Sequence, residues 1–187
     1  MTIEDNKDLI PDRAKKNIVE LTNCSADEYR RMAKLPIRIM ADNVRSMYNI
    51  GAIFRTSDAF LVDEFILGGS SGVPPHPEIS KTALGAEESV KWRHVDDCVA
   101  CAGEMQKEGW KVCVLEQTHG SVPLDRFTPE RGCRYLIIAG NEVEGVDQRL
   151  VDMSDCILEI PQCGTKHSLN VSSSASIALW HFFSHLR

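Results

Sequence analysis

The stretch IRIMADNVRSMYNIGAIFRTSDAF, residues 37–60, changes its hydrophobic pattern part-way along its length. The first part, residues 37–44, is rich in apolar side chains and ends in polar ones, which is typical of a buried strand. In the second part, residues 49–60, apolar residues recur at helical spacing. The stretch therefore predicts a strand that is followed directly by a helix.

The rest of the chain continues this alternation of strands and helices. Further strand patterns cover residues 64–69, 91–95, 111–117, 134–140 and 156–161. Helix patterns cover residues 79–90, 96–109, 147–153 and 171–187. The last helix has an apolar face formed by Val171, Ala175, Ala178, Leu179 and Phe182. Apolar strands that alternate with helices predict an α/β fold, with a mostly parallel sheet and helices on both faces.

The composition fits one soluble globular domain, because 43% of the 187 residues are apolar and 26% are charged. We expect an N-terminal arm with one short helix at residues 1–36 and the main domain at residues 37–187. The short helix begins at Ser25, since Ser25 and Glu28 have capping-box spacing, and Pro36 ends it. The sequence has no apolar run long enough for a membrane span and no secretory signal, so we expect a cytoplasmic protein.

The charge distribution limits how the protein could bind an anionic partner. A formal net charge of −6 argues against a protein that coats nucleic acid non-specifically. An anionic partner would have to contact a local basic cluster in the first half of the chain, which contains Arg30, Arg31, Lys34, Arg38, Arg45 and Arg55. A solvated helix face is the alternative interpretation of the first three.

The seven cysteines form no disulfide framework. Cys98 and Cys101 have C-x-x-C spacing, but no second pair or suitably spaced histidines follow, as a zinc site would require. Both lie in a segment with helical periodicity. We therefore favour packing in the core over metal binding or redox chemistry, and we predict no metal site.

Three predicted strand ends carry unusual polar sequences: residues 42–56, 140–146 and 160–170. Ligands of parallel sheets bind outside the carboxyl ends of the strands. Each polar group also has a structural alternative. Asn49 and Asn170 could be helix caps, Gly140 and Gly145 could serve turns, Glu142 could be a solvated acid and Arg55 a surface charge. However, Arg55 lies on a mostly apolar helix, where it is costly unless it faces a polar cleft.

The chain lacks a phosphate-binding loop, a dinucleotide fingerprint, a nucleophile elbow and a zincin motif. A nucleotide-like cofactor could still bind through main-chain groups of the strand-end loops. The segments LEQT, IIAGNE, EIPQ and HSLN would suit that role.

Together, the strand ends resemble the SpoU/TrmH branch of the SPOUT methyltransferases. NVRSMYNIGAIFRTSDAF looks like the first motif of that family, LIIAGNEVEGV like its second and LEIPQCGTKHSLNVSSSASIALW like its third. The resemblance implies S-adenosylmethionine as methyl donor and an RNA ribose 2′-hydroxyl as acceptor. It also implies a deep C-terminal trefoil knot and a homodimer.

Residue by residue, the resemblance implies a catalytic group of Asn49, Arg55, Glu142, Ser168 and Asn170. It implies a cofactor site formed by Leu115, Glu116, Ile138, Gly140, Ile160 and Leu169. For contact with RNA we expect Arg30, Arg31, Lys34 and Arg45. In the family Arg55 would activate the ribose hydroxyl, but a guanidinium keeps its proton, so a bidentate phosphate clamp is the alternative role.

The short chain looks more like the tRNA-modifying members than the ribosomal ones, so we favour tRNA over rRNA as substrate. Two other functions stay open. One is a catalytically silent module that binds RNA or cofactor, and the other is a methyltransferase directed at a nucleobase or a small molecule. The presence of Asn49, Arg55 and Asn170 favours the ribose methyltransferase.

Overall fold

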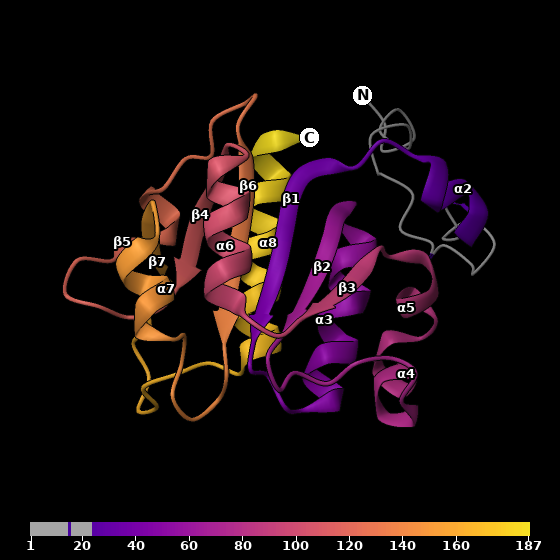
Figure 1. The fold of residues 1–187 in the computed structure, drawn as a ribbon, viewed down its shortest axis with the longest axis horizontal. Helices are drawn as coiled ribbons and strands as arrows, with labels where there is room; N and C mark the ends of the chain where they lie inside the picture. Colours follow the sequence, from indigo (N-terminus) through magenta and orange to yellow (C-terminus); the bar gives the residue numbers. More distant parts are fainter. Residues whose placement is uncertain (1–14, 16–23) are drawn as a thin grey trace, which may run out of the picture.

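The structure, a computed structural model, describes Lys15 and residues 24–187. The arm expected before Ser25 lies, apart from Lys15 and Cys24, outside the described residues. The described chain forms a seven-stranded sheet in the order β3-β2-β1-β6-β4-β7-β5, and every pair of neighbours is parallel (Figure 1). The strands are β1 Leu35–Asp42, β2 Val62–Gly68, β3 Trp92–Val95, β4 Trp110–Leu115, β5 Val122–Pro123, β6 Arg134–Gly140 and β7 Cys156–Glu159. The predicted parallel α/β fold is confirmed.

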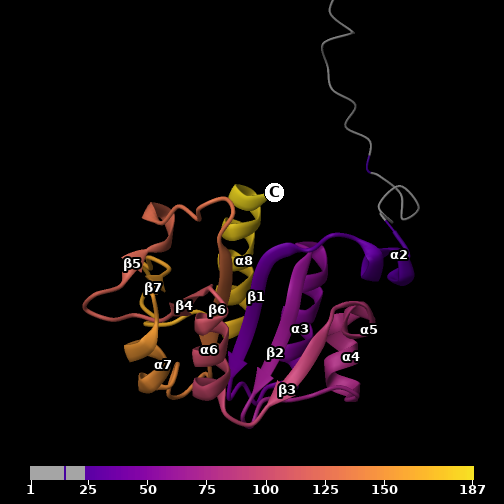
Figure 2. The same cartoon turned by 45° about the horizontal axis from the view of Figure 1, so that its top comes forward.

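Helices cover both faces of this sheet (Figures 1 and 2). The helices are α2 Ala26–Arg31, α3 Met47–Ala59, α4 Pro77–Ala83, α5 Ala86–Ser89, α6 Cys98–Lys107, α7 Gln148–Met153 and α8 Val171–Leu186. The larger core lies between the sheet and the side that carries α3, α4, α5 and α8, and the smaller one lies under α6 and α7. The apolar face predicted for the last helix is buried in the larger core.

The central strands are buried on both faces, which explains why they read as apolar runs. In β1, Ile37 and Ile39 enter the larger core while Met40 enters the smaller one. Alternate side chains of a strand point to opposite faces, so a strand covered on both sides needs apolar residues at nearly every position. This burial places β1 and β6 at the centre of the molecule.

The single helix predicted at residues 79–90 is wrong, because the structure divides it into α4 and α5. Leu84 and Gly85 both adopt left-handed backbone conformations, with φ of 52° and 92°, and this ends the first helix. The division lets α4 pack closely on α3. At Gly51 of α3 a Cβ atom would overlap Thr82 and the carbonyl oxygen of Ile79, so only glycine fits this contact.

The capping box at Ser25 is present, and it opens α2 as predicted. The helix ends at Arg31 rather than continuing to Leu35, because Leu35 already pairs in β1, where its N–H donates to the carbonyl of Leu61 at 2.9 Å. Pro36 is therefore a strand residue. Tyr29 of α2 is buried in the larger core and donates its hydroxyl to the carbonyl of Ser57 at 3.3 Å, so α2 packs against α3.

The short strand β5, Val122–Pro123, lies between two predicted strands, pairs with β7 and forms one edge of the sheet. With only two residues it has no periodicity that the sequence could reveal. Within the described part of the chain, none of the helices is both long and apolar enough to span a bilayer.

Candidate active site

A cavity of about 600 Å³ lies at the carboxyl edge of the sheet and is formed by three loops. These loops follow β4, β6 and β7, which are adjacent in the sheet (Figure 1). The loop after β4 contributes Glu116 and Gln117, the loop after β6 contributes residues 141–145, and the loop after β7 contributes Gln162 and residues 167–170. The cavity therefore lies where the parallel topology predicts a ligand site.

Most of the residues predicted to hold a cofactor line this cavity. They are Leu115, Glu116, Gly140, Ile160 and Leu169. Ile138 does not line it, since its side chain is buried in the smaller core. Val143, Glu144 and Ser174 also line the cavity and were missed. The position of Ser174 could have been found from sequence, because it lies one helical turn after Asn170.

The loop after β6 has little freedom to move, because hydrogen bonds close it from both sides. Asn141 accepts hydrogen bonds from the backbone N–H groups of Val143 (3.0 Å) and Glu144 (2.9 Å). Glu116 accepts one from Val146 N at 3.1 Å, and a Cβ atom at Gly140 would overlap the backbone of Gly145. Glu116 therefore supports this loop as well as lining the cavity.

Three of the predicted catalytic side chains meet at the edge of the cavity. Asn49 donates its Nδ2 hydrogen to Glu142 Oε1, and Asn170 Nδ2 donates to Asn49 Oδ1 at 3.1 Å. Each residue follows a different strand: β1, β6 and β7 respectively. Tertiary structure thus joins three polar segments that are far apart in sequence.

The structural alternatives for the two asparagines have different outcomes. Asn170 is indeed the cap of α8, because its Oδ1 accepts from Ser172 N at 2.9 Å. Its amide nitrogen stays free for Asn49, so one side chain does both tasks. The cap interpretation of Asn49 is wrong: Ser46 caps α3, and Asn49 lies within the first turn. Ser168 lines the same cavity and is exposed.

Arg55 lies apart from this cluster within one chain. It is exposed on α3 and lines a second cavity of about 770 Å³, which Tyr29 of α2, Asp58 of α3 and Ala86 of α5 also line. A helix rises 1.5 Å per residue, so Arg55 begins about 9 Å further along the axis than Asn49. Arg55 is not among the residues that line the first cavity. A single described chain therefore does not bring Arg55 to Glu142 and Asn170.

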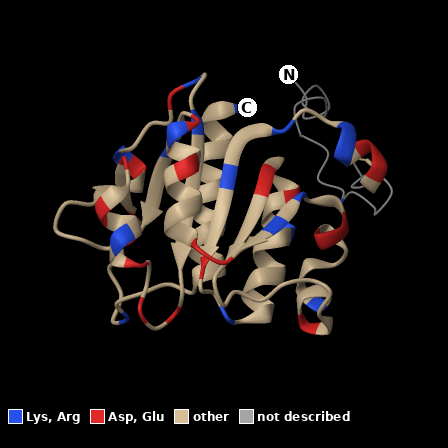
Figure 3. Cartoon of the chain, viewed as in Figure 1, with Lys and Arg blue, Asp and Glu red and all other residues tan. Residues whose placement is uncertain are grey.

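The basic residues predicted to contact RNA are partly engaged within the protein. Arg30 pairs with Asp27 at 2.5 Å and donates to the carbonyl of Glu88 at 3.0 Å. Lys34 donates to the carbonyl of Met32 at 3.1 Å and lies 4.0 Å from the Tyr29 ring centroid. On α2, acidic residues occupy the first turn and basic residues the last turn (Figure 3). The helix consequently carries no continuous basic face.

Two other predicted cations, Arg31 and Arg45, are exposed. Arg45 lies beside the carboxyl edge of the sheet and donates to Ser70 Oγ at 3.4 Å, a long hydrogen bond that leaves most of its donors free. Of the residues predicted to contact RNA, Arg45 is thus the one on the same edge as the cavity.

The cavity itself is acidic. Its lining includes Glu116, Glu142, Glu144 and Glu159, and no lysine or arginine is among the described residues that line it. Its floor includes the apolar residues Leu115, Leu158 and Ile160. These carboxylates favour a cationic ligand with an apolar portion, whereas a phosphate group would need a cation from elsewhere.

The C-x-x-C pair belongs to the core, as predicted. Cys98 and Cys101 both belong to α6 and are buried in the smaller core. Burial raises the pKa of both thiols, that of Cys98 to about 12, and the nearby Asp42 carboxylate adds to the effect at Cys98. Both thiols therefore stay protonated at neutral pH, which suits packing rather than nucleophilic chemistry.

Comparison with known proteins agrees with this geometry. The model of the SpoU rRNA Methylase family matches residues 36–180. The chain belongs to this family. The match includes all three strand ends that form the cavity and the Asn49–Glu142–Asn170 contact.

Named relatives of this SpoU-family chain are RNA methyltransferases. It is 28% identical over 145 residues to a putative TrmH family tRNA/rRNA methyltransferase of Staphylococcus aureus, covering 78% of this chain and 57% of the relative. It is 27% identical over 162 residues to the 23S rRNA (guanosine-2′-O-)-methyltransferase RlmB of Vibrio parahaemolyticus, covering 86% and 64%. The chain thus spans less than two thirds of the length of these curated relatives.

Solved structures show the same fold. The TrmH/SpoU tRNA modifying enzyme of A. aeolicus superposes with a TM-score of 0.76 at 24% identity, covering 86% of this chain and 81% of the other. The AdoMet-bound rRNA methyltransferase of Sinorhizobium meliloti gives a TM-score of 0.76 at 24% identity, covering 85% and 60%. At this identity the likeness establishes the architecture alone.

Proposed function

We propose that this SpoU-family protein transfers a methyl group from S-adenosylmethionine to a ribose 2′-hydroxyl of RNA, with tRNA favoured over rRNA. The observation that carries the proposal is the contact among Asn49, Glu142 and Asn170 beside the acidic cavity. It unites the residues that match the three family motifs. The name of the Vibrio relative, a guanosine-2′-O-methyltransferase, supports the ribose as acceptor.

The cavity fits the proposed cofactor. S-adenosylmethionine carries its transferable methyl group on a positively charged sulfonium. The carboxylates of Glu116 and Glu144 would favour that charge, while Leu158 and Ile160 offer apolar surface to an adenine ring. Main-chain groups near Leu115 and Gly140 would hold the base. The solved Sinorhizobium structure, described as AdoMet bound, supports the same ligand.

The catalytic residues would act mainly by position. Methyl transfer is an in-line displacement, so holding the hydroxyl about 3–3.5 Å from the methyl carbon supplies much of the rate. Asn49 and Asn170 would orient the ribose through their amide groups, while Glu142 keeps Asn49 in place. Ser168, in the loop after β7, would contact the RNA.

Arg55 would then come from a second copy of the chain, in a homodimer. The adjacent helices α3 and α8 expose Tyr48, Ile177 and Trp180 together with Arg55. Exposed aromatic and aliphatic side chains beside an arginine are the composition of protein interfaces. Such a dimer would bring the guanidinium of Arg55 to the cavity of its partner, where it clamps a phosphate and stabilises the forming alkoxide.

The remaining expectations belong to the same proposal. The C-terminal part would contain the trefoil knot of the family, residues 1–36 would act with Arg45 in choosing the RNA, and the protein would work in the cytoplasm. The preference for tRNA is supported by the A. aeolicus structure, which is described as a tRNA modifying enzyme and matches over 81% of its length. A silent binding module would not need the intact Asn49–Glu142–Asn170 contact.

Nucleoside mass spectrometry tests the proposal. The purified full chain would be incubated with methyl-labelled S-adenosylmethionine and either unmodified tRNA or rRNA, and the nucleosides analysed. We expect a labelled 2′-O-methyl nucleoside from tRNA. Label on a nucleobase would support the base-directed alternative, label from rRNA alone would overturn the tRNA preference, and no label in either RNA would support the silent module.

A further inference from the structure

Asp42, at the end of β1, is a buried carboxylate that the proposed chemistry does not use. Its residue surface is 1% exposed. Glu64, the other buried acid of the described chain, forms ion pairs with Arg38, Lys91 and Arg93. Among the ion pairs of the described residues, none involves Asp42. A buried charge is costly unless hydrogen bonds satisfy it. The hydrogen-bond donors to Asp42 therefore show which parts of the chain this carboxylate holds in place.

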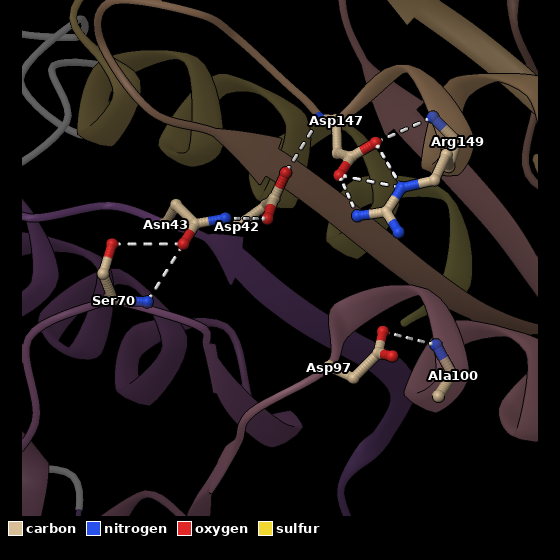
Figure 4. Close-up of polar contacts among 7 residues, drawn as sticks. All are labelled: Asp42, Asn43, Ser70, Asp97, Ala100, Asp147 and Arg149. Atoms are coloured by element: carbon tan, nitrogen blue, oxygen red, sulfur yellow. Dashed lines mark hydrogen bonds and ion pairs between the residues drawn. The ribbon is translucent and has the colours of Figure 1, made fainter.

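The first partner of Asp42 belongs to the loop that lines the cavity. Asp42 Oδ2 accepts a hydrogen bond from the backbone N–H of Asp147 at 2.8 Å. Asp147 ends that loop and caps α7, where its Oδ1 accepts from Arg149 N at 2.9 Å (Figure 4). Asp42 thereby fixes the point at which the loop carrying Glu142 enters the next helix.

The second partner leads into the helix that carries Asn49. Asn43 Nδ2 donates to Asp42 Oδ1 at 2.8 Å. Asn43 adopts a left-handed conformation with φ of 55°, and its Oδ1 accepts from Ser70 N at 3.0 Å and Ser70 Oγ at 3.1 Å. Figure 4 shows the resulting chain of contacts from Ser70 through Asn43 and Asp42 to Asp147. It connects the ends of β2 and β1 to the start of α7.

Asp42 thus holds the two segments that meet at the Asn49–Glu142 contact. One segment runs from Asn43 into α3, and the other runs back from Asp147 through residues 141–146. Fixing both from one buried carboxylate sets their separation, which a hydrogen bond between side chains requires to within a few tenths of an ångström. We propose that Asp42 is a positioning residue that aligns Asn49 with Glu142. This inference rests on the proposed function for its catalytic consequence.

The variant Asp42→Asn tests the inference while keeping the shape of the side chain. An amide has only one acceptor oxygen, so one of the N–H groups of Asp147 and Asn43 loses its partner. We expect kcat for methyl transfer to fall about tenfold, as for loss of one buried hydrogen bond, with KM for RNA within about twofold. A kcat within about twofold of wild type would overturn the proposal.

A double-mutant cycle with Glu142→Ala, which removes the acceptor for Asn49, separates positioning from general destabilisation. If Asp42 acts through Glu142, the double variant should have nearly the same kcat as the slower single variant. The Asp42 change already misplaces the Glu142 side chain, so removing that side chain costs little more. If the two fold-changes multiply, the residues act independently and the proposal fails.

Asp97→Asn is a matched control, since Asp97 is also an acid at this edge of the sheet (Figure 4). Asp97 Oδ1 accepts from Ala100 N at 2.9 Å and caps α6, away from the loop at residues 141–147. Asparagine is an equally good cap, so kcat should stay within about twofold. Should Asp42→Asn fail to fold, Asn43→Gly replaces it. Glycine accepts the left-handed backbone, and in the same cycle with Glu142→Ala the two fold-changes must again fail to multiply.

Amide hydrogen exchange distinguishes failure of this inference from failure of the proposed function. If the wild-type protein methylates no RNA, the proposed function is wrong, but Asp42 is still tested. Faster exchange at residues 141–147 in Asp42→Asn, with no change in residues 179–186 of α8, would support the positioning role. Unchanged exchange at these residues would overturn it.

Discussion

The two halves of the carboxyl edge of the sheet differ in how their strand ends are closed. At β1 and β2, side chains close the edge: Asp42 reaches Asp147, Asn43 reaches Ser70, and Ser71 Oγ donates to the carbonyl of Ala41 at 3.0 Å. At β4, β6 and β7, the loops leave a cavity of about 600 Å³. Ligands of open α/β sheets usually bind where the strand order reverses, and here the crevice between β1 and β6 is bridged by Asp42. Buried hydrogen bonds thus close the edge at β1 and β2, and the cavity lies beside this closed half, at β4, β6 and β7.

The largest effect is expected in the half of the edge that carries the cavity, at the close contact between Gly140 and the backbone of Gly145. In Gly140→Ala, the new Cβ atom would overlap the Gly145 backbone. Because the overlapped atoms are backbone atoms, the clash cannot be relieved by rotating a side chain. Displacement of residues 141–145 should weaken S-adenosylmethionine binding by about a hundredfold, measured by calorimetry. Gly120→Ala is the control, because nothing lies within 4 Å of its Cβ position. Equal affinity of the two variants would show that the loop tolerates displacement.

The next effect tests whether Arg55 acts across a dimer. Arg55→Ala should lower kcat about fiftyfold and leave cofactor affinity unchanged, because the proposed role of Arg55 is to clamp an RNA phosphate and not to contact the cofactor. Mixing it with Asn170→Asp should restore part of the activity, since one cavity of each mixed dimer then has both residues. Activity no higher than that of the two separate variants would contradict action in the partner. If Arg55→Lys is near wild type, the bidentate clamp is wrong.

A smaller effect is expected for Asn170→Asp, which separates the two tasks of this side chain. Aspartate caps a helix as well as asparagine does, so the melting temperature should change by less than about 2 °C. The donor to Asn49 is lost, and a carboxylate faces the Asn49 oxygen instead. We expect kcat to fall about tenfold. A large loss of stability would indicate that the contact with Asn49 also supports the fold.

The smallest effect is a pH dependence of local stability at Asp147, which Asp42 holds in the closed half of the edge. The Arg149 side chain first, and then the Arg149 backbone N–H, hold the pKa of Asp147 below its ordinary value of 3.8. Because the pKa of Asp147 is lower in the folded protein, its ion pair stabilises the fold fully at pH values above the ordinary pKa. This stabilisation is lost as the pH falls through the lowered pKa. Hydrogen exchange in α7 should therefore accelerate at pH values below 3.8. Asp147→Asn should abolish this pH dependence, and an unchanged dependence would assign it to other carboxylates.

Much of the fold could be predicted because its signals are local. The apolar runs of β1 and β6, the capping box at Ser25 and the apolar face of α8 follow from residue periodicity alone. The division between α4 and α5 was missed, since left-handed conformations at Leu84 and Gly85 are not encoded by an apolar pattern. The two-residue strand β5 is too short to have a period.

The candidate site was predicted less completely, for a geometric reason. Asn49, Glu142 and Asn170 were chosen from motifs, and the structure brings them into contact. Arg55 belongs to the same motif as Asn49, but the helix points it to another cavity. A motif gives spacing along the chain, whereas the direction of a side chain depends on how its helix packs.

The sequence by itself determined most of the strands and helices and the three polar segments at strand ends, because these depend on short-range patterns of residues. Only the tertiary structure decided that β6 lies between β1 and β4, which brings Asn49 to Glu142 and buries Asp42 beneath them. The order of strands is set by long-range burial of apolar surface over the whole chain. No local pattern of residues contains that information.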